Sequence, residues 1–147
     1  MPNIQEYMTE DHRRCDELFA LGEESVSQGN WDRAKQQTSE FISAMEHHFM
    51  MEEQVLFPAF EQRSGITEGP TSVMRREHQQ MRELFGELEP ALEEKRQEDY
   101  LDTMETLLIL MQQHNMKEEG MLYPMSDKEI GVDVEQVIAD MEQVSGQ

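Results

Sequence analysis

Hydrophobic residues recur along this chain with the 3.6-residue period of an α-helix, and no stretch alternates hydrophobic and polar residues for long enough to predict a strand. Two periodic stretches, at about residues 2–28 and 30–65, precede a loop of sequence GITEGPTS at 65–72. Two more follow it, at about 70–97 and 98–124. Because short connections favour antiparallel neighbours, the pattern predicts an all-α, up-down-up-down four-helix bundle.

Residues with known conformational preferences mark the ends of these helices. Asn3 is placed to cap the first helix, and Gly29 is placed to end it. Pro70 suits the first turn of the third helix, whereas Pro90 falls inside that helix and predicts a kink. A further stretch from Val134 to Val144 predicts a short C-terminal helix that caps one end of the bundle.

The chain contains an internal repeat with an offset of 66 residues and no gap. Residues 8–19, MTEDHRRCDELF, align with residues 74–85, MRREHQQMRELF. Residues 45–58, MEHHFMMEEQVLFP, align with residues 111–124, MQQHNMKEEGMLYP. The predicted bundle is therefore two copies of one helical hairpin, packed about a pseudo-twofold axis. Each copy carries one histidine on its first helix and an H-x-x-x-E pair on its second.

The repeated polar residues interrupt the apolar stripes of their helices, and residues four apart share a helical face with Cβ atoms about 6 Å apart. All six side chains should therefore point into the bundle at the same depth. Buried carboxylates are costly unless they are paired or bind metal, and the stripes carry no lysine or arginine. Imidazoles and bridging carboxylates suit two ions of iron, manganese or zinc. The predicted metal ligands are His12, His48, Glu52, His78, His114 and Glu118.

The simpler alternative, core histidines with hydrogen bonds and solvated glutamates, leaves the double repeat unexplained. His47 lies about 100° from His48 around the helix, so we expect it outside the ligand set. Glu53 and Glu119 recur symmetrically one residue off the ligand face, which predicts surface or helix-pairing roles, with Glu119 as an alternative bridge to Glu118. Sulfur-containing residues near the site are expected to fill the core rather than bind metal. They are Met8, Cys15, Met74 and Met81.

Two strings carry a resemblance to a known family. They are HFMMEEQVLFP at residues 48–58 and HNMKEEGMLYP at residues 114–124, and the pairs Asp11-His12 and Glu77-His78 complete the pattern. With these residues the chain resembles the hemerythrin-like, HHE cation-binding domain family over about residues 4–125.

The resemblance implies an antiparallel four-helix bundle with a non-haem di-iron centre, bridged by two carboxylates and an oxygen species (oxo or hydroxo). On the matching residues it makes the four repeated histidines terminal ligands, and Glu52 and Glu118 the bridges. Oxygen-carrying members have a further histidine one turn before the ligand of the third helix. This chain has Met74 at that position, so a five-histidine site is not supported.

Three hypotheses for function follow from this site. The leading one is binding of O2, or another diatomic such as NO, at an open coordination position, in a carrier, sensor or stress-protection role. The second is an enzyme, a di-iron oxidase or peroxidase, that uses the same positions. The third is a non-redox role, either iron buffering or a metal-stabilised interaction module, for which the acidic surface offers support.

The amino-acid composition limits which classes of partner, and which cellular compartment, we expect for this protein. Lys and Arg total 12 against 32 Asp and Glu, a formal net charge of −20, which disfavours nucleic acids and anionic membranes as partners. No apolar run reaches the roughly 18 residues of a membrane span, and the polar N-terminus lacks the pattern of a signal peptide. Cys15 is the only cysteine, so no internal disulfide can form. We therefore expect a cytoplasmic protein with a single domain over residues 1–147, its core at about 4–125 and its C-terminal helix at about 133–144.

Overall fold

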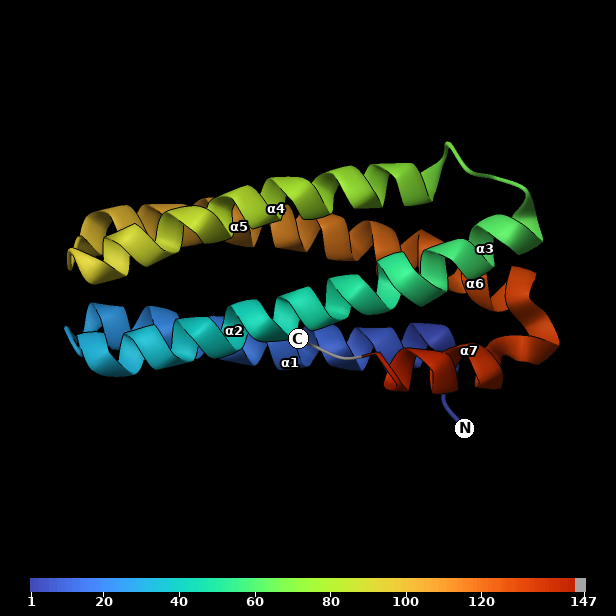
Figure 1. Cartoon of the computed structure of the whole chain (residues 1–147), viewed down its shortest axis with the longest axis horizontal. Helices are drawn as coiled ribbons and strands as arrows, with labels where there is room; N and C mark the ends of the chain where they lie inside the picture. Colours follow the sequence, from blue (N-terminus) through green and yellow to red (C-terminus); the bar gives the residue numbers. More distant parts are fainter. Residues whose placement is uncertain (145–147) are drawn as a thin grey trace.

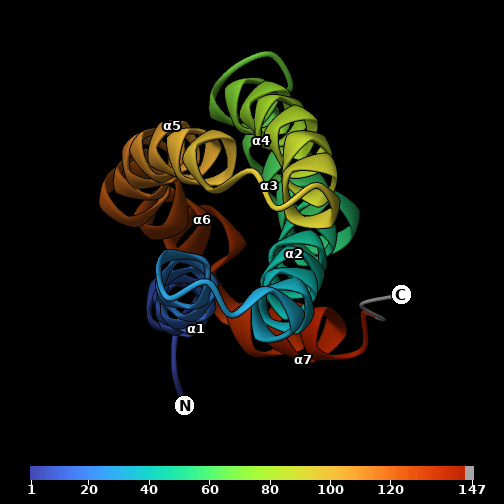
Figure 2. The same ribbon diagram turned by 90° about the vertical axis from the view of Figure 1, so that its left-hand side faces the viewer.

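Four long helices make up most of the computed structural model, which describes residues 1–144. They are α1 (Ile4–Ser27), α2 (Trp31–Met51), α4 (Pro70–Glu93) and α5 (Gln97–Lys117). α1 and α2 form one antiparallel hairpin, and α4 and α5 form the other (Figure 1). Seen from one end, α2 lies beside α4 and α1 lies beside α5 (Figure 2). The predicted four-helix bundle is confirmed, and no strand occurs within residues 1–144.

The first helix begins and ends where the sequence predicts. The side chain of Asn3 accepts a hydrogen bond from the N–H of Glu6, whose carboxylate accepts one from the N–H of Asn3. Asp127, in α6 (Tyr123–Ile130), accepts a hydrogen bond of 2.7 Å from the first N–H of α1 and so ties the start of α1 to α6. Beyond the C-terminus of α1, Gly29 adopts a φ of 74°, as expected of a helix-ending glycine.

The third helix ends earlier than the sequence predicts. α4 stops at Glu93, four residues before the predicted end near Gln97, and α5 begins at Gln97. The turn between them places Lys95 at a φ of 54°, a left-handed conformation that glycine usually supplies. Since no glycine marks this turn, the sequence gives no sign of it. Pro90 lies in the last turn of α4, and the kink there stays a prediction.

Two short π-helical segments interrupt the second and fourth helices at equivalent positions. η1 (Glu52–Leu56) joins α2 to α3 (Phe57–Ser64), and η2 (Glu118–Leu122) joins α5 to α6. The sequence predicts continuous α-helix here, and that prediction is wrong. The wider turn leaves room for the proline ring at the second position of α3 and of α6, beside the carbonyls of the preceding turn. The fourth helix also continues past its predicted end, through Ile130.

The buried apolar side chains form two clusters, and the repeated histidines and glutamates lie between them along each long helix. One cluster includes Phe41 and Phe85, whose rings meet edge to face at 5.9 Å. The other includes side chains from both π-helical segments and from the predicted C-terminal helix, α7 (Val134–Glu142), which follows the 3-10 segment η3 (Gly131–Asp133). α7 packs against η1 and α1, with Met141 fully buried. Within residues 1–144, no helix combines the length and the apolar character that crossing a bilayer requires.

Candidate metal centre

The six repeated histidines and glutamates converge between the four long helices. None of them exposes more than 4% of its surface, and both glutamates are fully buried. Two different hairpins therefore supply polar side chains to one point of the interior, as the repeat predicts. The contributing elements are α1 (His12), α2 (His48), η1 (Glu52), α4 (His78), α5 (His114) and η2 (Glu118).

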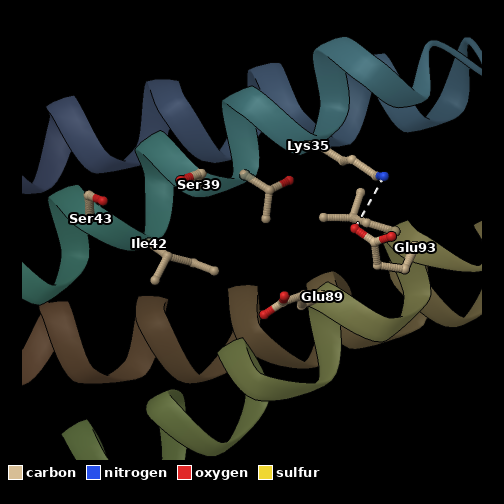
Figure 3. A pocket seen from close by; sticks show the side chains of 8 residues that line it. Lys35, Ser39, Ile42, Ser43, Glu89 and Glu93 are labelled. Atoms are coloured by element: carbon tan, nitrogen blue, oxygen red, sulfur yellow. Dashed lines mark ion pairs between the residues drawn. The ribbon is translucent and has the colours of Figure 1, made fainter.

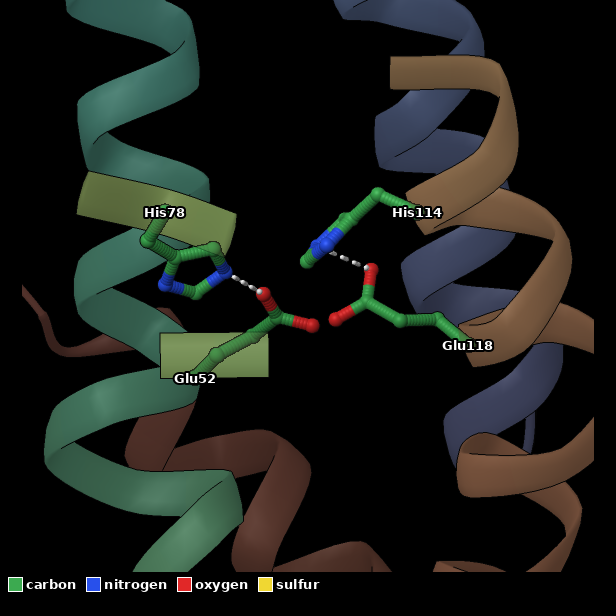
Figure 4. Close-up of side chains that lie close together, drawn as sticks. All are labelled: Glu52, His78, His114 and Glu118. Carbon is green, nitrogen blue, oxygen red and sulfur yellow. Dashed lines mark hydrogen bonds and ion pairs between the residues drawn. The ribbon is translucent and has the colours of Figure 1, made fainter. Parts of the chain in front are cut away.

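Each buried glutamate contacts a histidine from the other half of the repeat. Oε1 of Glu118 lies 3.0 Å from Nε2 of His12, and Oε1 of Glu52 lies 3.0 Å from Nε2 of His78. Nε2 of His114, four residues before Glu118, lies 3.2 Å from Oε1 of that glutamate. Figure 4 shows the two carboxylates directed toward each other from opposite sides of the bundle. The two hairpins thus share one polar site.

The donor atoms form two groups, each of a size that suits one metal ion. The four side chains drawn in Figure 4 make one group, in which the donor atoms all lie within 4.8 Å of one another. His12, His48 and Glu118 make the second group under the same limit. Glu118 belongs to both groups, and Oε2 of Glu52 lies 3.6 Å from Nε2 of His48. Both carboxylates therefore reach both groups, as bridging ligands must.

The outward ring nitrogen, Nδ1, of each of these histidines lies beside a second carboxylate. Such contacts hold the imidazole ring in one orientation, so that Nε2 stays directed into the site. The two halves use equivalent residues for this purpose. The four pairs are His48 with Asp11 at 2.7 Å, His114 with Glu77 at 2.8 Å, His12 with Glu119 at 2.7 Å and His78 with Glu53 at 2.6 Å.

Two of these outer carboxylates pair neighbouring helices, which is one of the roles that the sequence predicts for them. Glu53 and Glu119 lie one residue off the ligand face of an α-helix, which predicts surface or helix-pairing roles. Each lies in a π-helical segment and reaches a histidine of another helix, Glu53 contacting His78 and Glu119 contacting His12. Glu119 contacts the outward nitrogen of His12 and does not bridge the two groups. The symmetric recurrence of both glutamates is the signal in the sequence that points to this role.

Basic side chains hold three of the four outer carboxylates in place. The exception is Glu119, whose side chain is 37% exposed; the ion pairs within residues 1–144 join it to His12 alone. The halves of the repeat therefore differ in the support that surrounds equivalent ligands. The supported pairs are Asp11 with Arg14 at 2.9 Å, Glu53 with Arg82 at 3.0 Å and Glu77 with Lys117.

The charges of the site favour protonated histidines when no metal is bound. Burial by itself lowers the pKa of His114, but the charge of Glu118 and the hydrogen bonds to Glu118 and Glu77 together outweigh burial and raise this pKa to about 10. The pKa of His48 is likewise raised well above its ordinary value, because the charge of Glu52 and the contact with Asp11 overcome burial. Burial alone raises the pKa of Glu118, but the charge of His114 together with the hydrogen bonds around this carboxylate lowers the pKa well below its ordinary value. Metal ions, which bind neutral imidazole, must therefore displace protons from this site.

Orphaned polar atoms indicate that the site is built for a cation. Nε2 of His114 and Oε2 of Glu118 are buried without a hydrogen-bond partner among the described residues, although the two side chains approach each other. An unpaired buried polar group costs about 1–3 kcal/mol. Within residues 1–144, no lysine or arginine forms an ion pair with Glu52 or Glu118. Four imidazole nitrogens and two carboxylates, supported from outside, fit a centre of two divalent metal ions.

A tyrosine that the sequence does not single out also lies in the site. Tyr123 is fully buried, and its hydroxyl lies 2.7 Å from Oε2 of Glu52 and 2.9 Å from Oε1 of Glu118. The same oxygen lies 3.2 Å from Nε2 of both His12 and His48. Burial and the charges of the two glutamates raise the pKa of Tyr123 well above its ordinary value. The only sign of it in the sequence is a mismatch in the repeat, where Phe57 takes the equivalent position.

The other residues near the ligand strings lie outside the two donor groups. Nε2 of His47 lies 3.1 Å from the backbone carbonyl oxygen of Val144, away from the donor groups. Burial raises the pKa of the Cys15 thiol to about 11, which keeps it protonated in the core. The methionines near the site belong to the apolar clusters. They are Met8, Met74 and Met81.

A surface pocket between α2 and α4 lies apart from this chemistry (Figure 3). It has a volume of about 380 Å³, and an ion pair of 3.2 Å between Lys35 and Glu93 crosses its rim. Ser39 and Ile42 of α2 face Glu89 of α4 across it. None of the histidines or glutamates of the metal centre lines this pocket, so the donor groups remain the candidate functional site.

Comparison with known proteins agrees with the geometry. The model of one family, described as the hemerythrin HHE cation binding domain, matches residues 3–126. That range contains all six predicted ligands, the four outer carboxylates and Tyr123. No curated protein and no solved structure matches the chain significantly.

Proposed function

Because the chain belongs to the family of hemerythrin HHE cation-binding domains, we propose that it is a non-haem di-iron protein that binds O2 or NO. The diatomic would bind at a two-metal site bridged by carboxylates, in a carrier, sensor or stress-protection role. Glu52 and Glu118 would bridge the two ions, and each ion would take two histidines. The histidine ligands would be His12 and His48 at one position and His78 and His114 at the other.

One observation carries this proposal: two fully buried carboxylates face each other among four inward imidazole nitrogens, with no lysine or arginine from the described residues paired to either carboxylate. Two ionised carboxylates in such an interior need a compensating charge. Two metal ions supply it and also satisfy the orphaned atoms of His114 and Glu118. Two bridging carboxylates and two histidines give each ion about four protein donors, which leaves coordination positions for small ligands.

Residues around the donor groups would control the orientation of the ligands and the access of water to the metals. Iron would supply the redox change and the affinity for a diatomic ligand. The outer carboxylates hold the four imidazole rings in place, so that the geometry changes little when a ligand binds. Phe49 lies against His78 with ring centroids 4.0 Å apart, and the apolar clusters on both sides limit access of water. A dry, rigid surrounding favours ligand binding over uncontrolled oxidation.

The test is reconstitution of the purified protein with ferrous iron in the absence of oxygen, followed by exposure to air. We expect two irons per chain, and an oxo-bridged diferric centre in Mössbauer and absorption spectra. Glu52→Ala should bind less iron, whereas Glu40→Gln, an exposed change on the same helix, should bind as the wild type does. Wild-type protein that retains no iron pair, or that shows no oxo-to-iron charge transfer after oxidation, would contradict the proposal.

Peroxide and oxygen turnover distinguish ligand binding from the enzymatic alternative. We expect slow, stoichiometric reaction with peroxide and reversible or tight binding of NO to the diferrous protein. Rapid multiple turnover, well above that of free iron, would instead assign an oxidase or peroxidase activity to the same centre. A single zinc per chain after purification would point to a metal-stabilised interaction module.

A further inference from the structure

The two halves of the metal centre differ at one pair of equivalent residues. The rings of Phe57 and Tyr123 occupy matching places, because each centroid lies 5.7 Å from the imidazole centroid of the nearby first-helix histidine, His78 or His12. Both side chains are fully buried. Only Tyr123 adds an oxygen atom to the site, and this oxygen lies on the side of His12 and His48. The hydroxyl therefore makes the His12–His48 side of the centre different from the His78–His114 side.

The Tyr123 hydroxyl has more acceptors around it than it can satisfy. A phenol has one hydrogen to donate, yet its oxygen lies 2.7 Å from a carboxylate oxygen of Glu52 and 2.9 Å from one of Glu118. One of these two contacts therefore brings two oxygen lone pairs together. A positive ion among these oxygen atoms removes the conflict, because each oxygen then directs a lone pair at the ion.

The distances around this oxygen match those between neighbouring ligands of one metal ion. With metal–ligand bonds of about 2.1 Å, adjacent donors of an octahedral ion are about 3 Å apart. Oη of Tyr123 lies 3.2 Å from Nε2 of His12, 3.2 Å from Nε2 of His48 and 2.9 Å from Oε1 of Glu118. These three residues form one of the two donor groups. The hydroxyl oxygen is thus spaced as a fourth member of that group.

We propose that Tyr123 is a metal ligand through its phenolic oxygen, at the position held by His12, His48 and Glu118. The inference rests on the proposed di-iron function and deepens it. Tyr123 gives this metal one protein ligand more than the metal held by His78 and His114, because Phe57 has no donor atom to offer there. The two metals are therefore inequivalent, and the exogenous small ligand binds at the His78–His114 position.

The experiment uses oxidised, iron-loaded protein and resonance Raman spectroscopy with excitation in the visible charge-transfer region. A phenolate bound to ferric iron gives enhanced ring vibrations, which shift when ring-deuterated tyrosine is incorporated. We expect these bands in the wild type and their complete loss in Tyr123→Phe, with iron remaining at about two per chain. Tyr100→Phe is the matched control, since Tyr100 is also fully buried but bonds to Thr38 at 2.8 Å, outside the site.

The outcomes separate this inference from the function on which it rests. Wild-type protein with two irons per chain and no phenolate bands overturns the tyrosine ligand and leaves the di-iron proposal standing. It would mean that the hydroxyl only donates a hydrogen bond within the site. Bands that survive in Tyr123→Phe but vanish in Tyr100→Phe overturn it as well. Failure of the wild type to hold two irons overturns both proposals. If Tyr123→Phe does not fold, the deuterium shift in the wild type decides alone.

Discussion

Each of the two hairpins of this bundle carries three of the six proposed metal ligands, at equivalent positions, and the hairpins differ in what surrounds these ligands. Glu53, on the first hairpin, is held by Arg82, whereas its counterpart Glu119 has no lysine or arginine partner among the ion pairs of the described residues. Phe57 of the first hairpin becomes Tyr123 in the second. The repeat thus keeps the inner ligands the same, and the differences lie in the partners of the outer carboxylates and at the position of Phe57 and Tyr123. A symmetric set of inner ligands can therefore offer two metal ions different surroundings.

The strongest test of the comparison removes one bridge at a time. Glu118 belongs to both donor groups, whereas Glu52 belongs to one of them. We expect Glu118→Ala to lower the affinity for the metal pair more than 100-fold, beyond the 10- to 100-fold loss typical of outer contacts, and Glu52→Ala to retain more metal. Chelator competition with metal analysis measures both. Equal losses would show that the bridges are equivalent despite the spacing of their donor atoms.

The pH dependence of stability tests whether equivalent histidines contribute equally to the free energy of unfolding of the metal-free protein. The folded pKa of His114 is raised to about 10 from about 6.5 in the unfolded chain. A raised pKa stabilises the fold fully below pH 6.5, and this stability is lost as pH rises through about 10. We therefore expect the free energy of unfolding of the metal-free protein to fall by a few kcal/mol over this window.

Urea unfolding at several pH values measures this loss, and two variants locate it. The pKa of His48 is raised in the same direction, so His48→Gln and His114→Gln should each flatten the profile. With metal bound, the loss of stability between about pH 6.5 and 10 should disappear, because the histidine ligands are then already neutral. Metal is instead released toward acid pH, where protons compete for the histidines. A metal-free profile that rises toward pH 10 would contradict the assigned charges.

Changes in the outer carboxylates address the difference between the halves directly. Glu53→Gln and Glu119→Gln should each weaken metal binding 10- to 100-fold, because each releases the outward nitrogen of one histidine. Arg82→Gln should cost less than tenfold, since it loosens Glu53 without removing it. Arg13→Gln, an exposed change that disturbs only a pair with Glu10, is the control and should have no effect. An effect of Arg82→Gln as large as that of Glu53→Gln would place the arginine itself in the site.

Two glycines give the smallest effect and test how closely the helices pack at each position. A Cβ at Gly22 would lie 2.9 Å from the hydroxyl of Tyr100 in α5 and 3.2 Å from that of Thr38 in α2, so the close approach of α1 to both helices depends on this glycine. A Cβ at Gly86, in the middle of α4, meets open space. We expect Gly22→Ala to destabilise the fold by about 1–2 kcal/mol and Gly86→Ala to stabilise it by up to about 1 kcal/mol. Thermal unfolding of the metal-free variants measures both.

The bundle and the inner site could be predicted because periodicity and the repeat carry the information. His48 and Glu52 interrupt an apolar stripe, and their partners His114 and Glu118 do the same at the same offset. Buried polar residues that recur in this way have few explanations other than a shared site.

The remaining features depend on backbone detail that residue patterns do not display. The π-helical segments have no signature of their own in the sequence, and only the structure shows that Glu53 and Glu119 reach the outward nitrogens of His78 and His12. The end of α4 relies on a lysine in a left-handed conformation, where glycine would have been the signal. Tyr123 is visible as a mismatch with Phe57, but only the structure shows that its hydroxyl reaches both carboxylates.

The exchange of contacts across the pseudo-twofold axis has a consequence for how this protein assembles. His12 of the first hairpin touches glutamates of the second, and His78 of the second touches glutamates of the first. Neither hairpin contains a complete set of donors, so metal ions bound there would join the two halves of the molecule, and the free energy of metal binding would contribute to holding the halves together. A chain cut in the exposed loop at residues 65–69 should accordingly come apart or reassemble with the supply of iron.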